Sequence, residues 1–147
     1  MSVIYGVVRA NRLRIYLDAS PVIYAVERVA PYFDYLETLL FISGNTLVAS
    51  ELTRLEARVK PVREGNRLLI SQFDAFFGQT VDEIAPLTRE VMDKATLIRA
   101  QYGFRTPDAI HLGAAMTSRC DVFLTNDDRI SRFGGMSVEM IGGNLQG

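Results

Sequence analysis

Apolar residues occur along the chain in two alternating patterns: short apolar runs, and longer stretches with apolar residues at helical spacing. The short runs predict five β-strands, at residues 13–18, 46–49, 81–84, 122–124 and 138–141. The longer stretches predict helices, because residues three and four positions apart share one face of a helix. Strands that alternate with helices favour a parallel sheet. The chain is therefore predicted to fold as an α/β sandwich, with about five parallel strands and helices on both faces.

Residues that favour helix ends set the limits of the helices in the first half of the chain. Ser20 and Pro21 predict a helix start, as N-cap and first helical residue. The next part of the pattern predicts a helix from Ser50 to about residue 59 that ends before Pro61, because a proline disfavours helical backbone in the residue before it. A longer amphipathic helix is predicted over residues 63–77.

Two further helices are predicted in the second half. Thr88 and Gly103 are expected to cap the ends of the first of them. The second has the clearest start in the sequence: Thr106 as cap, Pro107 in the first turn, and Asp108 at the positive end of the helix dipole.

Length and composition indicate a single domain. The 147 residues are 48% hydrophobic, which is enough for one well-buried core and too little for two domains of ordinary size. We assign residues 13–147 to that domain and residues 1–12 to an N-terminal extension of unknown role. The extension is neither a signal peptide nor a membrane span, because arginines follow its short apolar run. One cysteine allows no internal disulfide, which fits a cytoplasmic protein.

The overall charge does not favour nucleic acid. There are 17 acidic and 16 basic residues, for a net charge of −1, so any contact with nucleic acid must be local. The basic residues are 14 arginines and 2 lysines. Arginine suits two-pronged phosphate contacts, although a coding bias explains the excess equally well.

Four acidic residues stand where predicted strands end or helices begin. Asp18 ends the run LRIYLDAS, Glu56 lies within SELTRLEA, Asp108 opens PDAIHLGAA, and Asp127 follows VFLTN. In open parallel sheets, ligands bind outside the carboxyl ends of the strands. Four like charges gathered there would repel each other, and a bound divalent cation would relieve the repulsion. Mg²⁺ and Mn²⁺ prefer oxygen ligands, so the pattern predicts a metal site of the kind that hydrolyses phosphodiesters.

The wording and order of these four segments resemble the PIN-domain ribonucleases, and within them the toxins of VapBC-type toxin–antitoxin pairs. The resemblance covers residues 13–142, and PDAIHLGAA and TND are its most specific parts. It implies a Mg²⁺-dependent endoribonuclease, with Mn²⁺ as the alternative ion. Asp18, Glu56, Asp108 and Asp127 would be both the metal ligands and the catalytic residues. It also implies three partners: an RNA substrate, a small cognate antitoxin and a second copy in a homodimer, with no membrane partner.

Two of the four acids have competitors nearby. The glutamate of the family lies six residues after a serine, which selects Glu56 over Glu51, although Glu56 could also pair with Lys60 one helical turn later. Family position likewise selects Asp127 over Asp128, which is expected to serve as a turn or cap residue.

Several polar residues near the acids are candidates for binding substrate. They are Ser20, Arg105, Thr125 and Asn126, and each has a structural alternative, as a helix cap, a solvated arginine or a turn residue. His111 shares a helix face with the third acid, but a lone histidine on a helix is more often a packing or hydrogen-bonding residue.

Two other classes of function remain as alternatives. A catalytically silent PIN-like interaction module would be expected to lack one or more of the acids, and all four are present. A phosphatase of the haloacid-dehalogenase type needs a second aspartate two residues after the first, where this chain has Ser20. No GxSxG, P-loop or GxGxxG motif supports acyl transfer, NTP hydrolysis or dinucleotide binding.

Overall fold

The structure is a computed structural model, and it describes residues 12–41 and 44–141. The predicted N-terminal extension therefore lies outside the described residues, apart from its last position. No helix in the described part of the chain is both long and apolar enough to cross a membrane.

Five parallel strands form one sheet, as the sequence predicts. They are β1 (Arg14–Leu17), β2 (Thr46–Ser50), β3 (Glu83–Ala85), β4 (Val122–Thr125) and β5 (Ser137–Met140). Their order is β3-β2-β1-β4-β5, with Tyr16 of β1 paired to Val48 of β2 and Phe123 of β4. After β1, the strands β2 and β3 are added on one side of it, and β4 and β5 are then added on the other side. Strand order therefore reverses between β1 and β4, which is where open parallel sheets bind ligands.

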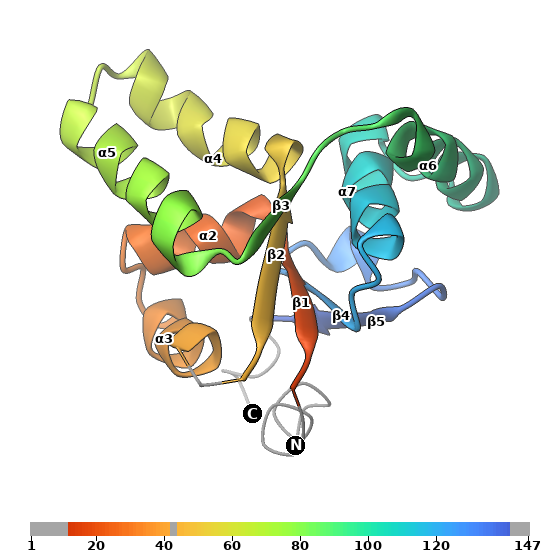
Figure 1. The fold of residues 1–147 in the computed structure, drawn as a ribbon, viewed down its shortest axis with the longest axis horizontal. Helices are drawn as coiled ribbons and strands as arrows, with labels where there is room; N and C mark the ends of the chain where they lie inside the picture. The colour runs from red at the N-terminus through yellow and green to blue at the C-terminus, as the bar shows by residue number, and fades with distance from the viewer. Residues whose placement is uncertain (1–11, 42–43, 142–147) are drawn as a thin grey trace.

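Helices cover both faces of the sheet (Figure 1), and the side chains of β1 alternate between the two apolar clusters. On one face lie α2 (Ala19–Val26), α3 (Tyr32–Phe41), α4 (Glu51–Arg63) and α5 (Arg67–Ala75), followed by a π-helical turn (Phe76–Thr80); on the other lie α6 (Arg89–Tyr102) and α7 (Thr106–Thr117). Ile15 and Leu17 belong to the first apolar cluster, and Tyr16 belongs to the second. This alternation follows from the two-residue period of a strand.

Helix α4 does not end before Pro61, which corrects the prediction from sequence. It runs on to Arg63, and the Pro61 ring is buried in its last turns. Proline removes one backbone hydrogen bond from a helix, and burial of its apolar ring offsets that loss here. The predicted helix over residues 63–77 also begins too early, because Gly65 adopts a φ of +65° and Asn66 caps α5 at Arg67.

Two other helix starts differ from the prediction. The N-cap of α2 is Asp18, whose carboxylate accepts a hydrogen bond from the Ala19 N–H, so Ser20 lies inside the helix. Helix α7 begins at Thr106, after Arg105 as N-cap without a side-chain capping bond. The caps expected for α6 are confirmed: Thr88 accepts a hydrogen bond at its start, and Gly103 ends it with a φ of +72°.

Candidate active site

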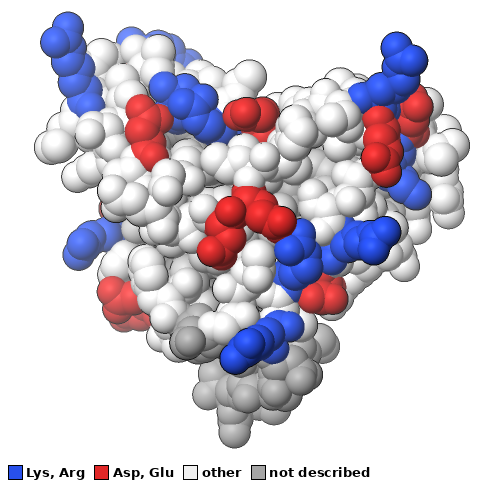
Figure 2. Space-filling model, in the orientation of Figure 1, with Lys and Arg blue, Asp and Glu red and all other residues white. Residues whose placement is uncertain are grey.

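The four predicted acids line one hollow, of about 250 Å³, at the carboxyl end of the sheet. Three of the four candidate substrate-binding residues, Ser20, Arg105 and Asn126, line it as well. Acidic side chains gather in the middle of one face of the molecule, with basic side chains beside them (Figure 2). Residues far apart in the sequence therefore meet where strand order reverses.

Thr125 hydrogen-bonds to two of the acids, to the side chain of one and to the backbone of the other. Its buried hydroxyl donates to Asp18 Oδ2 at 2.7 Å and accepts the N–H of Asp127 at 3.0 Å. Asp18 comes directly after β1 and also caps α2, whereas Asp127 follows β4 and caps the short 3₁₀ helix η2 (Asp128–Ile130). One threonine thus links the carboxylate of Asp18 to the backbone of Asp127, and with them the ends of the two central strands.

Ser20 and Asn126 tie helix α2 to the segment after β4. The Asn126 N–H donates to Ser20 Oγ at 3.0 Å, and the Asn126 side-chain amide donates to the Tyr24 hydroxyl at 3.0 Å. The sequence left open whether these residues build the turn or face the site. They do both, because each lines the hollow and each takes part in the hydrogen bonds that join α2 to the segment after β4.

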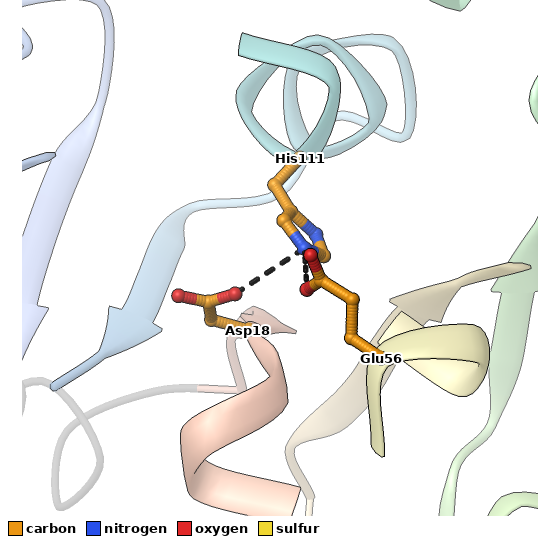
Figure 3. Close-up of side chains that lie close together, drawn as sticks. All are labelled: Asp18, Glu56 and His111. Atoms are coloured by element: carbon orange, nitrogen blue, oxygen red, sulfur yellow. Dashed lines mark hydrogen bonds and ion pairs between the residues drawn. The ribbon is translucent and has the colours of Figure 1, made fainter. Parts of the chain in front are cut away.

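His111 enters the site from α7, although no definite role was predicted for it. It is 1% exposed, and its Nε2 lies 2.7 Å from Glu56 Oε1 and 3.3 Å from Asp18 Oδ1 (Figure 3). One ligand atom from each of these three residues lies within 4.8 Å of the other two. Glu56 is thus engaged by His111, where the sequence also allowed a partner in Lys60.

A buried hydrogen-bonded chain behind His111 sets its ring orientation. The Tyr16 hydroxyl donates to Ser50 Oγ at 2.8 Å and lies 2.8 Å from His111 Nδ1. Since the phenol has only one proton, it must accept from an Nδ1–H of His111. Thr53 lies 3.3 Å from the same hydroxyl and donates to the Leu17 carbonyl. Burial raises the pKa of Tyr16, so the phenol stays neutral.

This bonding pattern favours the protonated form of His111. With Nδ1–H directed at Tyr16, Nε2 faces two carboxylates that can only accept, so it must also carry a proton when they are ionised. Burial alone would lower the pKa of His111. The hydrogen bond to Glu56 and the charges of Asp18, Glu56 and Asp108 outweigh it, and the pKa is raised.

The two remaining acids are paired with arginines. Arg105 reaches Asp108 through Nε and Nη2, at 3.0 and 3.3 Å, and Arg129 reaches Asp127 in the same two-pronged way, at 2.9 and 2.6 Å. The hydrogen bonds of Arg129 lower the pKa of Asp127. The repulsion expected among four acids is therefore offset by hydrogen bonds from His111 and by two guanidinium groups.

The competing acids lie outside the hollow. Asp128 is exposed at the start of η2, and Glu51 is exposed in the first turn of α4, where it complements the helix dipole. Arg54 and Arg58, which flank Glu56 on α4, both pair with Asp74 of α5.

The donor set of the hollow fits a hard divalent cation. Four acids line it, although only Asp18 and Glu56, with His111, place ligand atoms within 4.8 Å of one another, and its volume leaves room for the waters that Mg²⁺ retains. Two features of the site carried no signal in the sequence. Tyr16 stands in an apolar strand and reads as core, and Arg129 pairs across a turn, where no periodic spacing marks it.

A family model for the PIN domain matches residues 15–136 of the chain. No curated protein sequence matches this chain. Among solved structures, VapBC2 from Rickettsia felis, bound to a DNA fragment from its promoter, aligns with a TM-score of 0.72 and 17% identity over 87% of this chain and 98% of that chain. VapC20 from Mycobacterium tuberculosis, a Sarcin–Ricin loop cleaving toxin, aligns with a TM-score of 0.63 and 13% identity over 82% and 90%. VapBC from Salmonella typhimurium aligns with a TM-score of 0.62 and 18% identity over 88% and 98%. At identities this low, the structural likeness shows a shared fold and nothing more.

Proposed function

The chain belongs to the PIN domain family, and on that premise we propose that it is a metal-dependent endoribonuclease. The observation that carries this proposal is the meeting of Asp18, Glu56, Asp108 and Asp127 in one hollow at the switch point of the sheet. A silent interaction module would not need to keep four converging acids. The phosphatase alternative is weaker still, because Ser20, in place of its second aspartate, binds the backbone of Asn126.

The four acids would hold one or two Mg²⁺ or Mn²⁺ ions. When bound, such an ion makes water a stronger nucleophile and neutralises charge on the phosphodiester. Other residues of the site position or ionise these acids for metal binding. Thr125 fixes Asp18, Arg129 keeps Asp127 ionised, and His111 orients Glu56. Covalent catalysis is not required, since water is the nucleophile.

We further propose that the chain is the toxin of a toxin–antitoxin pair and acts in the cytoplasm as a homodimer. The support is similarity of fold to VapBC proteins. Three apolar residues on one stripe of α4, Leu55, Val59 and Val62, are about half exposed and offer apolar surface to a partner. Residues 13–147 would form a single domain, with Ser20, Arg105, Thr125 and Asn126 helping to place the RNA.

Metal dependence is the first test of this function. Purified protein is expected to cut single-stranded RNA when Mg²⁺ or Mn²⁺ is present and to stop when EDTA is added, because every proposed ligand is a carboxylate. Activity should return when Mg²⁺ is restored. Cleavage that persists after thorough chelation would rule out the mechanism, and loss that only Zn²⁺ restores would rule out the choice of ion.

A further inference from the structure

A second hollow, of about 290 Å³, opens beside the acidic one and shares Arg105 and Asp108 with it. Three arginines border it, Arg105, Arg129 and Arg132, and we call it the arginine groove. Basic side chains next to the central acidic group are visible in Figure 2. The net charge of the whole protein gives no reason to expect such a cluster at this place.

Arg132 is held in a defined position by an aromatic ring and a backbone carbonyl. Its guanidinium lies 4.3 Å from the centre of the Phe104 ring, and Nη2 donates to the Tyr102 carbonyl at 2.6 Å. Phe104 is buried and Arg132 is exposed, so one face of the guanidinium covers the ring and the other is open. Much of the entropy cost of ordering this arginine is therefore met before a ligand arrives.

Arg105 and Arg129 pair with acids that are proposed metal ligands. Each is more than half exposed and already touches the acidic hollow through its carboxylate partner. Once Asp108 and Asp127 are committed to a cation, both guanidinium groups lose much of their compensating charge. Of the two acids that line the groove, Asp108 and Asp128, only Asp128 then keeps a negative charge that no cation neutralises. The groove becomes strongly positive beside the place where a phosphodiester would be cut.

We propose that the arginine groove binds the RNA segment next to the cleaved phosphate. Arg105 and Arg129 contact phosphate oxygens, because arginine matches them with two parallel donors. The open face of Arg132 stacks on a neighbouring base, as guanidinium planes do in single-stranded RNA recognition. This inference rests on the proposed nuclease function, and it adds which side of the site the RNA follows.

Equilibrium binding separates this inference from catalysis. The probe is a short fluorescent single-stranded RNA of mixed sequence, titrated with protein in EDTA and followed by fluorescence anisotropy at several salt concentrations. Arg132→Gln is compared with Arg63→Gln, which removes the same charge at the exposed end of α4, away from both hollows. Arg132→Gln should weaken binding roughly fivefold and reduce the slope of log Kd against log salt by about 0.7 or less. Arg63→Gln should change neither.

Cleavage in Mg²⁺ tests the other two arginines. Arg105→Gln and Arg129→Gln should raise KM more than they lower kcat, because they remove contacts made before and during the reaction. If the wild type cuts RNA and all three groove variants match Arg63→Gln in affinity and KM, the groove assignment is wrong and the nuclease function stands. If the wild type does not cut RNA, the proposed function fails, and weaker binding by Arg132→Gln alone still supports an RNA groove. If the groove variants bind RNA as the wild type does but lose binding to polyglutamate, the arginine groove is a site for acidic peptide and the assignment is overturned.

Discussion

Replacement of Asp127 by asparagine is expected to reduce RNA cleavage by about 100-fold or more, whereas Asp128→Asn should retain most activity. Asp127 lines the acidic hollow and is kept ionised by Arg129, so its loss removes a metal ligand and leaves that arginine's charge uncompensated beside the site. Asp128 is the matched control for the acidic hollow, because it is the adjacent acid, carries the same charge, and lines only the arginine groove.

Thermal melts accompany this assay. Asp128→Asn should change the free energy of unfolding by no more than about 0.5 kcal/mol, as is usual for surface positions. Simple repulsion among four acids would make Asp127→Asn more stable than the wild type without metal. The Arg129 pair opposes that gain, so no increase is expected. If Asp128→Asn abolishes cleavage and Asp127→Asn does not, the fourth acid is wrongly assigned.

Replacement of His111 by alanine is expected to lower the free energy of unfolding in EDTA by about 1–3 kcal/mol and to reduce cleavage strongly. The substitution removes the imidazole that lies between Asp18 and Glu56 and leaves the Tyr16 hydroxyl without one of its partners. Differential scanning fluorimetry with and without Mg²⁺ measures the first effect, and single-turnover cleavage measures the second.

The response to metal distinguishes two roles for His111. If its charge only balances the empty site, the more negative site of His111→Ala should gain more thermal stability from Mg²⁺ than the wild type does. If His111 is itself a ligand, the gain should shrink. Tyr16→Phe is the companion variant, because it keeps the imidazole and removes the hydroxyl that orients it. We expect it to lower cleavage less than His111→Ala does. Wild-type activity and stability in both variants would contradict a role for this chain of hydrogen bonds.

The fold was predictable because its signals are local or periodic. The apolar runs of β1, β2, β4 and β5 predict strands within a residue or two of their observed ends, and β3 is displaced by two at its start. Thr88 and Gly103 marked both ends of α6 correctly. The errors came where packing overrode local preference. Pro61 stays in its helix because its ring is buried, which no single-residue preference includes.

The candidate site was predictable only in its acids. Asp18 and Asp108 were selected by position beside a strand and at a helix start, and Glu56 and Asp127 by the family resemblance; all four line one hollow. Their counter-charges were not foreseen. His111 reaches Glu56 from a different helix, across 55 positions of sequence, and such a pairing leaves no trace in either local pattern.

Direct binding of Mn²⁺ to the folded protein tests the central claim, that the four acids form one cation site. Isothermal titration of the wild type with Mn²⁺ should give saturable binding, accompanied by a rise in melting temperature through mass action. Asp18→Asn and Asp108→Asn should each weaken that binding and reduce the rise in melting temperature, while Glu51→Gln, an exposed acid outside the hollow, should match the wild type. Folded wild-type protein that binds no Mn²⁺, or site variants that bind it as tightly as Glu51→Gln does, would contradict the account.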